Sequence, residues 1–147
     1  MPKYNIKWDS GQMKNYLFED EYMKIGINKN SNILEIKTKK VCDDTKELDK
    51  HITIINQYVK DTHPEKIIFS LTNLDQISKE SLLNDKFLPC IGTNGVKTMA
   101  IVTGENKKVQ TLVSELGAYL SPLKKEYDIN SETFETYQKA MNWIKET

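Results

Sequence analysis

Two short apolar runs, IIFSL at residues 67–71 and MAIV at residues 99–102, decide the fold class of this 147-residue chain. Both are rich in bulky apolar side chains and contain almost no polar ones. Such runs are typical of strands that are covered on both faces, as in a parallel sheet with helices packed against it. We therefore expect both runs to be central strands of an α/β domain.

Upstream of these runs, residues 21–40 have the pattern of a β-hairpin. Tyr22, Lys24 and Gly26 alternate with Met23, Ile25 and Ile27, the run NKNSN at residues 28–32 interrupts, and ILEIKT at residues 33–38 resumes the pattern. Alternation on both sides of an Asn-rich turn indicates two antiparallel strands. Residues 1–20 are polar with scattered aromatic side chains, and we expect an N-terminal arm or a short extra strand there.

A helix is expected to follow the hairpin. Asp44 stands three residues before Glu47, as in a capping box, and the dipeptide His63-Pro64 is a stop signal. The apolar stripe of this helix is expected to comprise Leu48, Ile52, Ile55 and Val59. We place His51 outside this stripe and interpret both histidines as solvated surface residues.

The remaining elements alternate helix and strand. Helices are expected over about residues 78–87 and 109–120, with a turn at residues 92–95 after Pro89. Tyr127 and Ile129 suggest a last short strand. Ser131 is expected to cap a final helix. The buried stripe of that helix would be Phe134, Tyr137, Met141 and Ile144.

Together these patterns predict one α/β domain over residues 21–147. Its mixed β-sheet is opened by an antiparallel hairpin and continues with alternating helices and strands. The later strands should be parallel, because right-handed crossovers through helices produce parallel neighbours. The length suits a single hydrophobic core.

Charge and composition limit the classes of partner. Lys plus Arg and Asp plus Glu number 21 each, and every basic side chain is a lysine. Lysine lacks the planar fork that reads guanine or phosphate, so we expect no nucleic-acid partner. No apolar run has the length of a membrane span or the form of a signal peptide, so we expect no membrane span and a cytoplasmic location.

Common catalytic and metal-binding patterns are absent from the sequence. It has no phosphate-binding glycine loop, nucleophile elbow or HExxH zinc pattern. Cys42 and Cys90 have no CxxC spacing and are interpreted as free, small apolar residues. The acidic runs at residues 19–21 and 43–44 are interpreted as solvated turns and a helix cap rather than metal ligands. We expect no metal and no cofactor.

One polar segment stands where α/β proteins bind ligands. Thr72, Asn73, Asp75 and Ser78 leave the carboxyl end of the first central run and enter an expected helix. Ligands of open α/β sheets bind at that edge, and Thr103 ends the neighbouring strand. Ordinary loop and capping hydrogen bonds are the alternative explanation of these side chains.

Three stretches resemble the bacterial STAS-like domains, the sulfate transporter and anti-sigma-factor antagonist family. They are YMKI at residues 22–25 with ILEI at 33–36, FLP at 87–89 with GVKTMAIV at 95–102, and AMNWI at 140–144. The resemblance implies a non-enzymatic switch that is phosphorylated on a hydroxyl after the central strand, in an Asp-Ser-Ser-Gly-like sequence. Here residues 75–78 read DQIS, so the acid and hydroxyl are separated and the glycine is missing. The resemblance makes Ser78 the candidate phospho-acceptor, with Thr72 behind it.

Three functions follow from these observations. The first is a regulatory or interaction module that binds a protein partner, or a second copy of itself, around residues 72–78. The second is a domain that binds a small apolar or anionic ligand between the sheet and the segment 82–91. The residues expected to line that pocket are Leu82, Leu83, Phe87, Leu88 and Ile91. The third, less favoured, is an enzyme that uses carboxylates alone.

Overall fold

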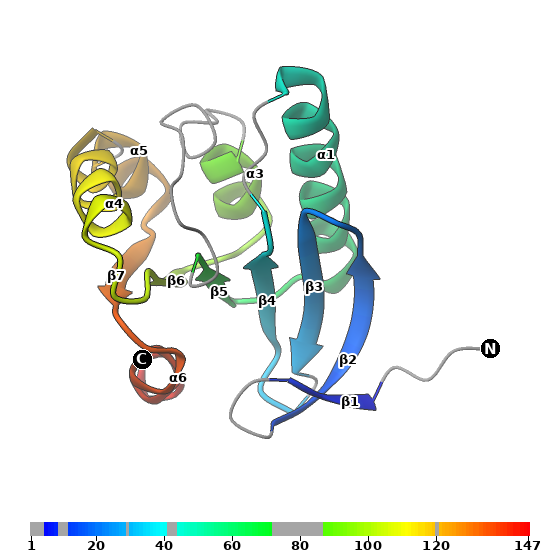
Figure 1. Ribbon diagram of the computed structural model, residues 1–147. Coiled ribbons are helices and arrows are strands. Elements are labelled where there is room, and N and C mark those ends of the chain that lie inside the picture. The colour runs from blue at the N-terminus through cyan, green and yellow to red at the C-terminus, as the bar shows by residue number, and fades with distance from the viewer. Residues whose placement is uncertain (1–4, 9–11, 29, 41–43, 72–86, 120) are drawn as a thin grey trace.

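A computed structural model describes residues 5–8, 12–28, 30–40, 44–71, 87–119 and 121–147 (Figure 1). Its strands are β1 (Asn5–Trp8), β2 (Gln12–Glu19), β3 (Met23–Asn28), β4 (Ile33–Thr38), β5 (Lys66–Ser70), β6 (Thr98–Val102) and β7 (Asn130–Phe134). Its helices are α1 (Thr45–Thr62), α3 (Phe87–Thr93), α4 (Lys107–Tyr119), α5 (Ser121–Tyr127) and α6 (Tyr137–Glu146).

The seven strands form one mixed sheet in which the spatial order equals the chain order, β1 to β7. Pairs from β1 to β4 are antiparallel, and pairs from β4 to β7 are parallel. The predicted fold class, a mixed sheet opened by an antiparallel hairpin and continued by alternating helices and strands, is confirmed. The expected hairpin is β3 and β4, with Gly26 opposite Glu35.

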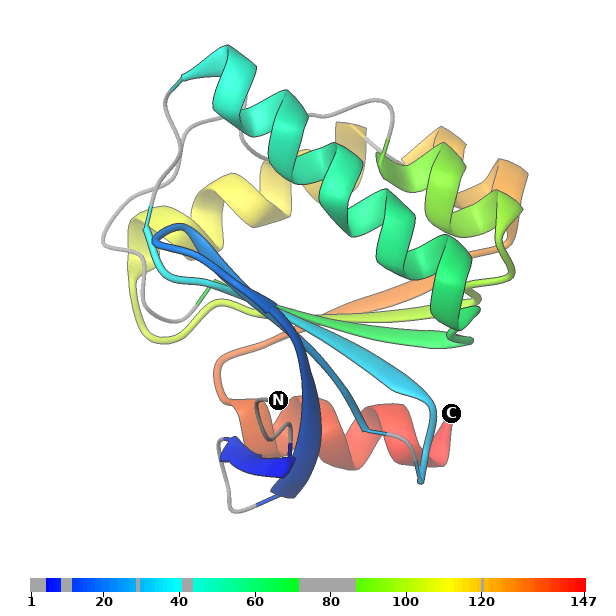
Figure 2. The same ribbon diagram turned by 90° about the vertical axis from the view of Figure 1, so that its right-hand side faces the viewer.

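The helices are divided unequally between the two faces of the sheet. Figure 2 shows α1, α3, α4 and α5 on one face and α6 on the other. This follows from the strand order, since each right-handed crossover between parallel strands advances one position in the same direction and stays on one face. We call the face under α1, α3, α4 and α5 the crossover face and the other the α6 face.

The main core lies between the crossover face and α1 with α3. Ile25, Ile36, Ile67 and Ile91 are almost fully buried there, together with Val59 of α1. Burying an isoleucine side chain of this kind stabilises the fold by about 1.5–3 kcal/mol. Ile67 and its neighbour Ile68 are buried on opposite faces of β5, so the expectation of a strand covered on both sides is confirmed.

Both ends of α1 match the sequence signals. The Asp44 side chain accepts a hydrogen bond from the Lys46 N–H, which satisfies one of the unpaired donors of the first turn. At the other end His63 has the left-handed conformation, with φ 47°, and donates its N–H to the Val59 carbonyl. Pro64 follows, so the helix ends where the sequence predicts it.

The last helix does not begin where the sequence analysis expected. The prediction that Ser131 caps it and that Phe134 lies on its stripe is wrong, because residues 130–134 form strand β7. The N-cap is Thr136, whose hydroxyl accepts from the Lys139 N–H. Met141 and Ile144 do face the core, as predicted. They pack against the α6 face of β5, β6 and β4, where Ile33, Ile68, Ala100 and Val102 lie.

Two further expectations are corrected on the crossover face. Tyr127 is the last residue of α5 and not part of a strand. The turn expected over residues 92–95 begins later, because α3 continues to Thr93 and contains Pro89. Proline is tolerated there because it lies in the first turn, whose N–H groups have no partner within the helix. The helix expected over residues 78–87 lies almost wholly outside the described residues.

The N-terminal residues contribute two strands. β2 is eight residues long and pairs with β3 along its second half, and the four-residue β1 pairs with its first half. The β2–β3 register shifts between Tyr16 and Phe18, so Leu17 forms a bulge. The Leu17 carbonyl accepts a hydrogen bond of 3.0 Å from the Tyr58 hydroxyl of α1.

Candidate functional site

The candidate site is the edge at which the parallel strands β4, β5 and β6 have their carboxyl ends. Hydrogen bonds join the described backbone segments at this edge. The Leu71 N–H donates to the Val102 carbonyl at 2.7 Å, and the Thr38 hydroxyl donates to the Ser70 carbonyl at 2.9 Å. The chain leaves β5 immediately beside the end of β6, as the sequence analysis expected.

Of the five residues predicted for a partner surface at this edge, the structure describes one. Thr103 follows β6 directly and is 1% exposed. Its hydroxyl donates to the Gly104 carbonyl at 2.9 Å and lies 3.4 Å from the Phe134 carbonyl. The Thr103 hydroxyl therefore stabilises the backbone at the strand end and does not face solvent. Thr72, Asn73, Asp75 and Ser78 lie outside the described residues.

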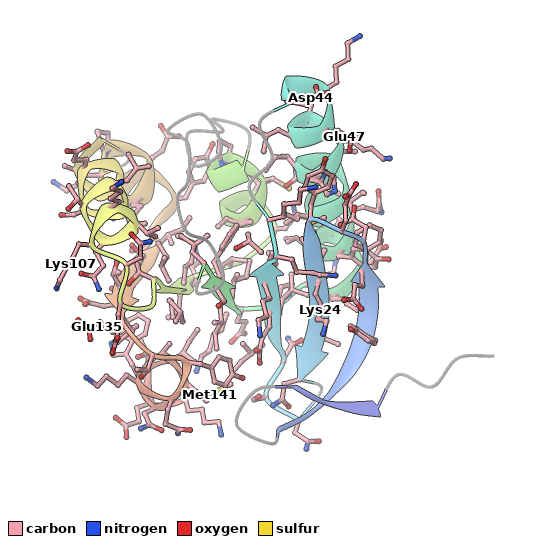
Figure 3. The ribbon with its side chains drawn as sticks, viewed as in Figure 1. Lys24, Asp44, Glu47, Lys107, Glu135 and Met141 are labelled. Carbon is pink, nitrogen blue, oxygen red and sulfur yellow. The ribbon has the colours of Figure 1, made fainter. Side chains whose placement is uncertain are left out.

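The start of α4, at the same edge, is closed by a side-chain cap. The Asn106 Oδ1 accepts from the N–H groups of Lys108 at 2.9 Å and Val109 at 3.2 Å. The Gln110 amide donates to the Gly104 carbonyl at 2.9 Å, which fixes the connection from β6. Figure 3 shows Lys107 at the start of α4 and, across the molecule, Asp44 and Glu47 at the start of α1.

A contact between a buried histidine and a half-buried carboxylate, which the sequence analysis missed, lies beside the end of β4. Asp20 occupies the β2–β3 turn, and its Oδ1 accepts from the N–H groups of Tyr22 at 2.8 Å and Met23 at 2.9 Å. Its Oδ2 lies 2.6 Å from Nε2 of His51, on α1. The other ring nitrogen, Nδ1, lies 2.6 Å from the Glu47 carbonyl oxygen. We call Asp20 and His51 the turn clamp.

The geometry of the turn clamp fixes the direction of one of its hydrogen bonds. A carbonyl oxygen can only accept, so Nδ1 of His51 donates to the Glu47 carbonyl. The other ring nitrogen, Nε2, lies within hydrogen-bonding distance of the Asp20 carboxylate. Burial raises the pKa of Asp20, but hydrogen bonds from His51, Met23 and Tyr22 outweigh it, and the pKa is lowered overall. Both ring nitrogens are engaged, so the clamp holds the turn against α1.

The interpretation of His51 as a solvated surface residue is therefore wrong, since it is 5% exposed. The spacing contained the signal, because His51 stands three residues after Leu48 and four before Ile55, on the same helical face. The Tyr22 ring also packs against the imidazole in a T-shaped arrangement, with the centroids 5.1 Å apart. His63 is exposed, as expected.

A second group of polar side chains surrounds Glu19, at the end of β2. Lys39 contacts its carboxylate at 2.8 Å and Lys24 at 3.9 Å, and the Tyr16 hydroxyl donates to it. Hydrogen bonds from Lys39 and Tyr16 lower the pKa of Glu19. Burial, together with the neighbouring carboxylate, raises the pKa of Tyr16 to about 12. These groups tie β2, β3 and the end of β4 together.

Within the described part of the α6 face, one carboxyl group is buried. Glu35, in the middle of β4, is 2% exposed, and one of its oxygens accepts a hydrogen bond of 2.9 Å from the Tyr137 hydroxyl. Lys66 of β5 donates to the Ile144 carbonyl at 2.7 Å, so two polar contacts join α6 to the sheet. Figure 3 shows Met141 on α6, below the sheet. In the sequence, the position of this acid between apolar residues in ILEI was the feature that indicated a buried carboxyl group.

The predicted ligand pocket falls partly within the described residues. Ile91 is fully buried and belongs to the main core. Phe87 and Leu88 begin α3, while Leu82 and Leu83 lie outside the described residues. The neighbouring Cys90 is half-buried, and burial raises the pKa of its thiol against the opposing effects of Lys60 and Asn94.

No protein-family model matches this chain, and no curated protein matches it. Within the parts of the chain that the structure describes, no helix has the length and apolar character to cross a membrane. In those same parts, no three His, Cys, Asp or Glu side chains gather as the ligands of a metal ion would.

Proposed function

We propose that this chain is a non-catalytic regulatory or protein-interaction module of the STAS-like type. Its partner surface is the carboxyl edge of the sheet around residues 72–78. The mixed sheet, opened by a hairpin and continued by alternating helices and strands, supports the proposal, because the three stretches that carry the resemblance belong to that hairpin, to α3 with β6, and to α6.

The observation that carries the proposal is the way the edge is built. On one side of the carboxyl end of β5, the turn clamp fixes the β2–β3 turn to α1. On the other side, Thr103 and Asn106 fix the connection from β6 to α4. These polar groups hold backbone in place. A surface framed by fixed backbone loses little conformational entropy on binding, which favours recognition of a protein partner.

The first test is affinity capture of partners by the full chain from cells of its source. Two variants change the proposed surface, Asp75→Lys and Ser78→Glu. Two matched controls make the same substitutions on exposed helix positions, Asp49→Lys on α1 and Ser114→Glu on α4. We expect a partner that the wild type and both controls retain, and that Asp75→Lys reduces by about tenfold or more, as loss of a central contact would. Capture that is equal for all five proteins would contradict the proposed surface.

Native mass spectrometry of the chain from the same cells separates the alternatives. A phosphoryl group on Ser78 supports a phospho-switch, since it brings close to two negative charges to that segment. A mass of two chains supports self-association at the edge if Asp75→Lys abolishes it. A discrete small-molecule adduct, with no partner in the capture experiment, would instead favour the ligand-binding alternative.

A further inference from the structure

We propose that β7 is a second interaction surface, independent of the carboxyl edge, which accepts an extended basic segment of another protein as an eighth strand. The sheet order ends at β7, and among the described strands only β6 pairs with it. Figure 1 shows β7 as the outermost strand on the side opposite β1 and β2. An edge strand presents N–H and C=O groups that can bind a further strand.

The register shows which groups of β7 point outward. The Asn130 N–H donates to the Lys97 carbonyl, and the Phe134 carbonyl accepts from the Thr103 N–H. The N–H and C=O groups of Asn130 and Phe134 therefore point toward β6. Because the direction alternates along a strand, those of Glu132 point the same way. The N–H and C=O groups of Ser131 and Thr133 point away from the sheet. Thr133 is exposed, which agrees with an uncovered edge.

The opposite edge of the sheet is protected. β1 covers only Gln12–Asn15 of β2, and the remainder of β2 contains the bulge at Leu17. The Leu17 carbonyl is already bonded to the Tyr58 hydroxyl. A bulge and a short terminal strand are the usual devices that prevent further pairing, so β7 is the edge that offers a regular ladder.

The side chains of β7 select the kind of strand. Glu132 is exposed at the centre of the strand, and Glu135, seen at the outer side of the molecule in Figure 3, follows the strand end. If the bound strand is antiparallel, Glu132 and the residue opposite it form a closely spaced pair that has no backbone hydrogen bonds. A lysine or arginine there gives a favourable cross-strand pair.

The same geometry disfavours a second copy of this chain. Two β7 strands related by a two-fold axis form most hydrogen bonds when Ser131 of each pairs with Thr133 of the other. This register places the two Glu132 carboxylates directly opposite each other, and like charges in that position are unfavourable. Glu132 thus rejects self-pairing and favours a basic segment.

Amide hydrogen exchange in the full chain first tests whether the edge of β7 is uncovered. We expect rapid exchange at Ser131 and Thr133 and slow exchange at Asn130 and Glu132, whose N–H groups face β6. Slow exchange at Ser131 and Thr133 in the free chain would show that the edge is already covered and would overturn the proposal.

Binding is tested with a displayed library of random short peptides selected on the full chain. We expect peptides with alternating Lys or Arg, which slow the exchange of Ser131 and Thr133 when bound. Thr133→Pro removes one outward N–H and blocks the ladder, so it should weaken binding by about tenfold or more, whereas Thr133→Ala keeps that N–H and should bind like the wild type. Glu132→Lys should lose the basic peptides, while Glu126→Lys, with the same charge change on α5, should not.

The proposal is overturned if no peptide is recovered, or if the recovered peptides bind Thr133→Pro as well as the wild type. Peptides that depend on Asp75 but not on Thr133 would indicate the carboxyl edge instead. Loss of the natural partner in Asp75→Lys with normal peptide binding at β7 would in turn show that the two surfaces are separate.

Discussion

Removing the charge of Asp20 should destabilise the fold by an amount that disappears in acid. In Asp20→Asn the side-chain oxygen can still accept from Tyr22 and Met23, so the turn bonds at 2.8 and 2.9 Å are kept. The amide nitrogen replaces the oxygen that faces His51 and donates to Nε2, so the bond to His51 reverses direction and changes from charge-assisted to neutral. Charge-assisted bonds contribute about 1.5–3 kcal/mol and neutral ones about 0.5–1.5, so the expected loss is about 1 kcal/mol.

The comparison of two further variants tests this assignment. Asp20→Ala removes all three hydrogen bonds of the carboxylate and should cost about 3 kcal/mol. Glu21→Gln is the control, since the neighbouring carboxylate of Glu21 pairs with Lys40 at the surface and both side chains are more than half exposed. Such exposed pairs contribute little, so Glu21→Gln should leave the free energy of unfolding unchanged within error.

The sign of the pH dependence follows from the lowered pKa of Asp20. A carboxyl group whose pKa is lower in the folded state stabilises the fold fully above its unfolded pKa, about 3.9 for aspartate. That contribution is lost as the pH falls through the lower folded-state value. Urea unfolding at neutral pH and at several acidic pH values measures it. The difference between wild type and Asp20→Asn should vanish once Asp20 is protonated, and a difference that persists unchanged there would refute the ionised clamp.

Two further predictions concern packing and the buried carboxyl group. Gly92→Ala should destabilise the fold by about 1–3 kcal/mol, because the added Cβ would lie 2.6 Å from the Tyr127 Cβ. On α4, the Cβ of Gly117→Ala would meet nothing within 4 Å, so this variant should stabilise the fold by about 1 kcal/mol. Thermal unfolding of both variants checks this, and equal effects would contradict it. Tyr137→Phe removes the hydroxyl that donates to Glu35 and should cost about 1–3 kcal/mol in urea unfolding, and an unchanged midpoint would show that the bond contributes nothing.

The parts of the fold that the sequence predicted are those with a strong hydrophobic period. The alternation in β3 and β4 and the apolar runs of β5 and β6 predicted their strands, because each buries apolar side chains at a fixed spacing. Asp44 predicted the start of α1 for an equally local reason, its hydrogen bond to the first turn.

The failures occurred where tertiary structure overrides local pattern. β7 is an edge strand with mostly exposed, polar residues, so it has no apolar signal, and Ser131 resembles a helix cap in the sequence. The partner of His51 is Asp20, 31 residues away in the sequence, and that of Glu35 is Tyr137, 102 residues away. A single sequence gives no indication of such pairs, because they depend on how turns and helices are placed against the sheet.

The agreement between chain order and sheet order bears on how the protein is made. Each strand pairs with the strand that precedes it in the sequence, so the sheet can grow as the chain leaves the ribosome, without waiting for a distant partner. Among the described helices, α6 alone lies on the other face of the sheet, where Tyr137 contacts β4 and the Ile144 carbonyl accepts from Lys66. We therefore expect α6 to gain its protection last in pulse-labelled hydrogen exchange during refolding. Early protection of α6 would contradict this order, in which the helix on the other face of the sheet packs after the strands have paired.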